Sequence, residues 1–143
     1  MPKSTTFSND LVALIFNGTP IATFADNASS SAATNLFLSL HTASPGVGGS
    51  QTTNETNYTN YARIPVTRNL AGWTVSGGSA TNAALAQFPQ CGLTGSTITH
   101  VSIGTSLTGA GKVLYSGALT ASLAVANLIQ PQFAIGALTA SES

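Results

Sequence analysis

Short apolar segments, each broken after a few residues by Gly, Pro or Asn, recur along residues 36–139. In the first of them, 36–41 (LFLSLH), three leucines alternate with other residues. This period of two is typical of a β-strand with one strongly apolar face. Regularly spaced short strands with turn residues between them are typical of a sandwich or a barrel. We therefore predict an all-β fold, a jelly-roll-like β-sandwich of about eight short strands.

The same pattern gives approximate bounds and a core. Pro65 places the second strand at a sheet edge or a bulge, because proline cannot donate a ladder hydrogen bond. The predicted strands are 36–41, 61–67, 72–76, 81–88, 97–104, 112–117, 122–129 and 132–139. The predicted core consists of Leu36, Leu38, Leu40, Ile64, Val66, Trp73, Val75, Phe88, Val101, Ile103, Leu114, Phe133 and Ile135.

One short helix is expected before the first strand. Three N-capping residues, Ser8, Asn9 and Asp10, precede the apolar run 11–16, and Asn17-Gly18 is a helix stop. We predict a helix at 9–17. Residues 1–10 are predicted to form an N-terminal arm, and residues 11–143 a single β-sandwich domain.

A long polar loop is expected at 47–60, which holds mainly Gly, Ser, Thr, Asn and Gln. Loops of this length are uncommon in compact domains and are often functional. Tyr58 is the aromatic residue of this loop, whereas Trp73 is expected in the core. Arg63 lies near the start of the predicted strand 61–67 and Arg68 directly follows it, and a solvated ion pair with Glu55 is their expected role.

Scarcity of charge excludes several functions. The chain has four Lys or Arg and four Asp or Glu among 143 residues, but 17 Ser and 20 Thr. Four scattered cations cannot neutralise a nucleic-acid backbone, so we predict no nucleic-acid partner. The apolar runs are too short to cross a bilayer, and Met1–Asp10 lacks the pattern of a signal peptide. We expect no membrane partner, synthesis in the cytoplasm, and a surface that lies largely against neighbouring proteins.

No catalytic or metal-binding pattern is present in the sequence. Residues 106–113 (SLTGAGKV) lack the first Gly and the final Ser or Thr of a phosphate-binding loop, which favours a hairpin turn. His41 and His100 have no metal-ligand spacing with each other or with Glu55 and Asp26. Cys91 is a single thiol, and the nucleophile motif G-x-S-x-G is absent. We predict a protein that is not an enzyme and that holds no metal and no cofactor.

Several motifs in order resemble a family of small virion structural proteins of tailed bacteriophages, described as capsid decoration or tail fibre proteins. The resemblance runs from about Leu36 to Thr139, and the segment before it is particular to this chain. It rests on 36–46 (LFLSLHTASPG), 54–63 (NETNYTNYAR), 72–73 (GW), 88–89 (FP), 103–105 (IGT), 114–117 (LYSG) and 133–138 (FAIGAL).

The resemblance implies a phage structural protein without enzymatic activity. We predict a capsid decoration (cement) protein on the outer surface of the head, which binds the major capsid protein and itself as a symmetric dimer or trimer. The alternative is a tail or head fibre adhesin that contacts host-surface carbohydrate, and a carbohydrate-active enzyme is a third, weaker reading. The predicted partner-binding residues lie in the arm and the polar loop: Lys3, Phe7, Asn54, Glu55 and Tyr58.

Overall fold

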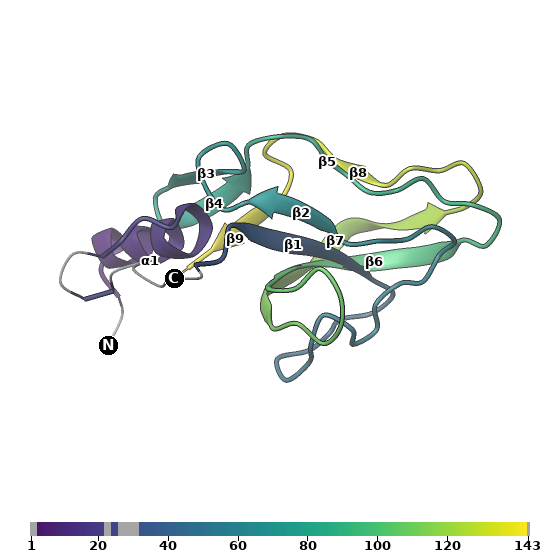
Figure 1. Cartoon of the computed structure of the whole chain (residues 1–143), viewed down its shortest axis with the longest axis horizontal. Helices are drawn as coiled ribbons and strands as arrows, with labels where there is room; N and C mark the ends of the chain where they lie inside the picture. Colours follow the sequence, from purple (N-terminus) through teal and green to yellow (C-terminus); the bar gives the residue numbers. More distant parts are fainter. Residues whose placement is uncertain (1–2, 22–23, 26–31, 143) are drawn as a thin grey trace. The chain divides into compact units, whose positions relative to one another are not determined.

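The computed structural model describes residues 3–21, 24–25 and 32–142 (Figure 1). The described residues form an all-β structure with a single short N-terminal helix, as predicted. The described part contains nine strands where about eight were expected. Its elements are α1 (Thr5–Asn17), β1 (Asn35–His41), β2 (Ile64–Thr67), β3 (Trp73–Ser76), β4 (Ser79–Asn82), β5 (Ala86–Gln87), β6 (Ser96–Gly104), β7 (Val113–Val125), β8 (Gln132–Phe133) and β9 (Thr139–Ser141).

Two compact units share the chain. The first comprises Met1–Asn35, Thr67–Ala86 and Phe133–Ser143, and the second comprises Leu36–Val66 and Gln87–Gln132. Folding of residues 11–143 as one domain stays a prediction.

In the first unit, α1 begins at Thr5, four residues before the predicted start. Ser4 is the N-cap and its side chain accepts a hydrogen bond from the Phe7 N–H, so the capping residue lies upstream of the three we considered. Gly18 ends the helix in the left-handed region, with φ of 66°. Residues 5–8, which we assigned to the N-terminal arm alone, are therefore helical as well. No helix in the described residues is long and apolar enough to span a membrane.

The helix packs beside a three-stranded sheet of order β3-β4-β9, whose strands pair antiparallel (Figure 1). Phe16 of α1 meets Trp73 of β3 edge to face, with ring centroids 4.7 Å apart. Both side chains are buried, as is Val12. The core role of Trp73 is thus confirmed. Helix α1 is too short to be stable alone, and its apolar face packs against this sheet.

The second unit contains a four-stranded sheet of order β2-β1-β6-β7. Strand β1 pairs antiparallel with β6, so that Leu38 lies opposite Ile103 and Leu40 opposite Val101. Leu36, Leu38 and Leu40 are all buried, which confirms the apolar face predicted from their alternation.

Other parts of the predicted pattern were wrong. Ile135 is 70% exposed, because the predicted strand 132–139 divides into β8 and β9 around a turn at Gly136. The predicted strands 112–117 and 122–129 are instead one strand, β7, whose pairing with β6 resumes after a register shift between Ala118 and Leu123. Six further predicted core residues are only half-buried: Ile64, Val66, Val75, Val101, Leu114 and Phe133. Strands β5 and β8 form a two-stranded sheet.

Candidate functional site

Two loops of the second unit come together beside the four-stranded sheet. The longer, residues 42–60, follows β1, and the shorter, residues 105–112, joins β6 to β7. We call these two loops the loop platform. They meet at a backbone bridge between Ser50 and Lys112, and in Figure 1 they run side by side below the sheet. The predicted polar loop is therefore a fixed element with a defined partner.

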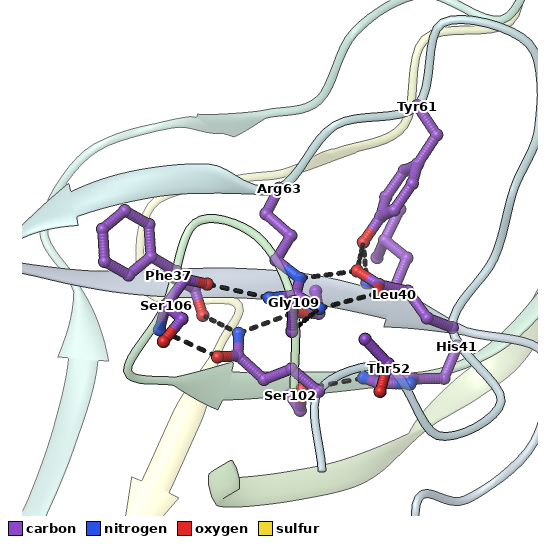
Figure 2. A network of polar contacts seen from close by, with 12 residues as sticks. Phe37, Leu40, His41, Thr52, Tyr61, Arg63, Ser102, Ser106 and Gly109 are labelled. Atoms are coloured by element: carbon purple, nitrogen blue, oxygen red, sulfur yellow. Dashed lines mark hydrogen bonds and ion pairs between the residues drawn. The ribbon is translucent and has the colours of Figure 1, made fainter. Parts of the chain in front are cut away.

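Gln51 joins the two loops to the sheet. Its side chain is fully buried, and its Nε2 donates to Ser39 Oγ at 2.8 Å and to the Phe37 carbonyl at 3.4 Å. Its Oε1 accepts from the Ser106 N–H at 2.9 Å, and its own N–H donates to the Gly111 carbonyl at 2.8 Å. An unpaired amide in the interior would lower the stability of the fold. Because the donors and the acceptor of Gln51 are paired, its side chain is held in place. Figure 2 labels two of these partners, Phe37 of β1 and Ser106 of the shorter loop.

Two glycines make room for this amide. A Cβ added at Gly104 would lie 2.2 Å from Gln51 Cδ, and one added at Gly111 would lie 2.2 Å from Gln51 Oε1. Both distances are far below van der Waals contact. Gln51 thus leaves no room for a side chain at 104, and Gln51 and Ser106 together leave none at 111.

Arg63 and Glu55 form a bidentate ion pair at the base of the platform. Arg63 Nε reaches Glu55 Oε1 and Nη2 reaches Oε2, each at 2.7 Å. The remaining guanidinium donors go to the carbonyls of Ser106 at 3.0 Å and Gly109 at 2.8 Å. The hydrogen bonds that Arg63 donates to the Glu55 carboxylate raise the pKa of Arg63. The pair was expected to be solvated, but the Arg63 side chain is 3% exposed and that of Glu55 is 15% exposed. Both charged groups of the pair are therefore satisfied by contacts within the protein.

Tyr61 extends the network to the sheet. Its hydroxyl donates to Glu55 Oε1 at 2.8 Å and accepts from the Leu40 N–H at 3.1 Å. Burial raises the pKa of Tyr61, so the phenol stays protonated as the donor.

His41 holds the other side of the longer loop. Its ring is fully buried, with Nδ1 2.9 Å from the Thr53 carbonyl and Nε2 2.8 Å from Ser102 Oγ (Figure 2). Because a carbonyl only accepts, these partners assign the proton to Nδ1 and make Nε2 the acceptor of the serine hydroxyl. Burial lowers the pKa of His41. The imidazole is thus a neutral structural link between β1, β6 and the loop.

The structure does not bring the five predicted partner-binding residues together. Lys3 pairs with Glu142 at 2.5 Å, and Phe7 is 42% exposed on α1, both in the first unit. In the second unit, Glu55 is held by Arg63, and Asn54 is exposed with φ of 54° and donates to the Ser44 carbonyl at 2.8 Å.

Tyr58 corrects our expectation most clearly. It is 2% exposed, and its hydroxyl donates to the Pro89 carbonyl at 2.8 Å. Burial raises its pKa to about 12. Its ring contacts that of Tyr61, with centroids 5.3 Å apart, so it belongs to the core beneath the platform and offers no stacking surface.

The chemistry open to the platform follows from what its surface retains. Across the part of the chain that the structure describes, no three His, Cys, Asp or Glu residues lie close enough to hold a metal ion. Cys91 is buried. The exposed platform residues include Val47, Thr52, Asn57, Leu107 and Thr108. What the arrangement presents is a braced surface of hydroxyl, amide and small apolar groups, with the exposed cation Lys112 at the end of the shorter loop.

Comparison with known proteins agrees with this picture of a structural component. No curated protein matches the chain. A family model described as podophage GP4 fiber I protein gp80 matches residues 2–141, which is nearly the whole chain. That match confirms the resemblance to tailed-phage virion proteins, and the family is a structural one, not a known enzyme family. The chain therefore belongs to the podophage GP4 fiber I protein gp80 family of phage virion structural proteins.

Proposed function

We propose that this protein is a subunit of a virion fibre and that its loop platform contacts the bacterial surface. Family membership supports the fibre assignment, because the family description names a fibre. The single observation that carries the contact assignment is the buried Gln51, Glu55 and Arg63 network, which braces two loops whose outer residues are exposed.

Bracing of this kind favours recognition. A loop that is already ordered loses little conformational entropy when it binds, so more of the contact energy becomes affinity. The charged groups beneath the loops serve as scaffold, since the Arg63 guanidinium is satisfied by one carboxylate and two loop carbonyls. The outer residues are left to contact a ligand.

Surface chemistry indicates the class of ligand. Exposed Thr52, Asn57 and Thr108 supply hydroxyl and amide groups, and exposed Val47 and Leu107 supply apolar area without charge. Such a surface suits polyhydroxylated molecules, and wet polar contacts are normal at weak interfaces. We assign host-surface carbohydrate as the ligand, with affinity raised by the many copies on a particle.

The fibre assignment replaces our first prediction of a capsid decoration protein. Both belong to the same broad class of virion structural protein, and the family description favours the fibre. In this proposal the N-terminal region attaches the protein to the virion. Phe7 of α1 is 42% exposed and is available for that contact. Because deletion of residues 1–7 would remove the N-cap and first turn of α1, Phe7→Glu is the appropriate variant to test attachment.

Competition for adsorption tests the proposed contact. Purified protein added in excess should slow adsorption of the phage to its host, and Val47→Lys with Leu107→Lys should abolish this inhibition, because two desolvated cations oppose the contact. Leu93→Lys is the matched control, since Leu93 is 88% exposed outside the platform. Equal inhibition by the platform variant and the intact protein would overturn the assignment of the platform.

A further inference from the structure

We propose that the turn 126–129 of the second unit is a contact surface for a second copy of this chain, with Leu128 and Ile129 at its centre. The contact is two-fold, so that the same turn of both copies meets across the axis. This inference concerns association between subunits and stands independently of the ligand proposed for the loop platform. It rests on the backbone conformation of Leu128, the exposure of its side chain and the lack of charge around it.

Leu128 has a backbone conformation that leucine rarely adopts. The Ile129 N–H donates to the Ala126 carbonyl at 2.9 Å, which closes a four-residue turn, and Leu128 is the third residue of that turn with φ of 69°. A positive φ at this position favours Gly or Asn, because other side chains are strained there. Asn127 directly precedes Leu128, so the chain has a suitable residue one position away and does not place it at the strained position.

Hydrogen bonds hold Leu128 in this conformation. Its N–H donates to the Cys91 carbonyl at 2.9 Å, and its carbonyl accepts from Gln90 Nε2 at 2.9 Å. The Cys91 N–H donates to the Ile129 carbonyl at 2.8 Å, and the Cys91 side chain is buried. The turn is therefore fixed against residues 90–91, which belong to the same unit.

The strained residue carries an exposed apolar side chain. Leu128 is 68% exposed, and its neighbour Ile129 is 42% exposed. Neither the strain nor the exposure stabilises a single copy of the chain, because Gly or Asn would relieve the strain and a polar side chain would suit the solvent. Strained residues that persist in a fold cluster at functional sites, and adjacent exposed apolar groups mark contacts with other molecules. Both observations favour burial of Leu128 in a contact.

The lack of charge around the turn identifies the occupant. Residues 86–99 and 126–131 contain no charged side chain. They surround the aliphatic pair with exposed amides, those of Gln90, Asn127 and Gln130. An amide both donates and accepts hydrogen bonds, so an aliphatic centre with a rim of amides is complementary to an identical surface. A two-fold contact requires such self-complementarity, whereas a rim of one charge sign would repel its own copy.

The size of the surface indicates a weak contact. Two aliphatic side chains and their rim bury well under the roughly 1,200–2,000 Å² of a stable complex, so two free copies associate only at high concentration. Contacts of this strength become effective when copies are held close together. A fibre, the structure that the family description names, holds neighbouring subunits in that way.

Nuclear magnetic resonance of the full-length chain tests the contact, because it detects weak association and maps the residues involved. As the concentration rises from about 50 μM to about 2 mM, the amide shifts of 90–91 and 126–130 should change. Leu128→Asn should raise the dissociation constant about tenfold or more and so abolish this change. The same variant should raise the urea midpoint of unfolding, because asparagine tolerates a positive φ. Leu70→Asn is the matched control, since Leu70 is 77% exposed in the first unit, and it should keep the concentration dependence of the intact chain.

A spin label identifies the occupant. Asn127→Cys that carries the label, mixed with isotope-enriched intact chain, should broaden the amides of 126–130 in the enriched copy, because the same turn meets itself. The native Cys91 is 2% exposed, and the intact chain treated with the label measures its background. Amide shifts that are independent of concentration, an equal dependence in Leu128→Asn, or broadening confined to another surface would overturn the proposal. A turn that binds only a different protein would give the first of these results.

Discussion

Arg63 lies at the base of the loop platform and donates hydrogen bonds to Glu55 and to two loop carbonyls. A buried ion pair is costly to form, and breaking it from one side is costlier still, because the remaining charge has no compensation. Because Arg63 also donates to the Ser106 and Gly109 carbonyls, we expect loss of the pair to disturb the loops.

Glu55→Gln tests this role at the scale of one atom. The variant keeps the shape of the side chain but leaves the 3%-exposed guanidinium without its counter-charge, and we expect a loss of about 3–5 kcal/mol in the free energy of unfolding by urea. Lys3→Gln is the control, because it removes an ion pair whose side chains are 29% and 30% exposed and should cost under about 1 kcal/mol. Similar losses in both variants would contradict a scaffolding role for Glu55.

His41 predicts a dependence of stability on pH. Burial favours its neutral form, so its pKa in the folded chain lies below the ordinary value of 6.5. Between these two values the unfolded chain binds more protons, and the stabilisation that is complete above pH 6.5 is lost as the pH falls through this window. The groups whose charges act on His41 are Glu55, Arg63 and His100.

Urea unfolding at about pH 8 and about pH 5.5 measures this effect. The intact chain should be less stable at the lower pH, and His41→Gln should reduce the difference while lowering stability overall. His100→Gln is the matched control and should keep the dependence of the intact chain. A His41→Gln variant with an unchanged pH dependence would assign the effect to another group.

Sequence reasoning worked at the residue scale where burial follows a local period. Leu36, Leu38 and Leu40 could be assigned to the core because they alternate within one strand. The Glu55–Arg63 pair could be anticipated from charge alone, but its burial could not. That burial depends on the carbonyls of Ser106 and Gly109, which lie more than 40 positions along the chain.

At the scale of elements, the contact between Gln51 and Gly104 couples the longer loop to β6. The three atoms nearest to the Cβ of Gly104→Ala would all belong to the Gln51 side chain, which is buried and held by hydrogen bonds. We expect Gly104→Ala to cost about 1–3 kcal/mol, as overpacking does.

A double-mutant cycle isolates that coupling. In a Gln51→Ala background the space is empty, so Gly104→Ala should cost under about 0.5 kcal/mol. Gly117→Ala serves as the control, because a Cβ there has nothing within 4 Å. Additive costs in the cycle would show that Gly104 is required for a reason other than Gln51.

The C-terminal end of α1 depends on Arg68. Its Nε donates to the Ile15 carbonyl at 2.6 Å and its Nη2 to the Leu14 carbonyl, two of the acceptors that a helix end leaves unsatisfied. Arg68→Met should lower stability by about 1–3 kcal/mol and speed amide hydrogen exchange in α1. Lys112→Met, a change at an exposed residue, should leave exchange in α1 unaltered.

Elements were predictable where their stop signals are local. Asn17-Gly18 ended α1 as expected, but the start was missed because Ser4 outcompetes three other capping residues that lie inside the helix. The fusion of two predicted strands into β7 was missed because Gly117 has an open, extended environment and makes no turn. For both the start of α1 and the continuity of β7, the sequence allows more than one boundary. Packing of the surrounding residues selects the one observed.

At the scale of the whole molecule, the all-β class and the phage family followed from periodicity and motif order, and the family match confirms the second of these. The loop platform could not be derived in this way. Its bracing joins residues of β1, the longer loop and the shorter loop, and no single segment contains that pattern.

Our central claim is that the chain is a fibre component of the virion. The copy number per virion tests it most directly, by quantitative mass spectrometry of purified particles with the major capsid protein as internal reference. A fibre subunit should be present in tens of copies. Hundreds of copies, in a fixed ratio to the capsid protein, would contradict the fibre assignment and show that the chain decorates the head.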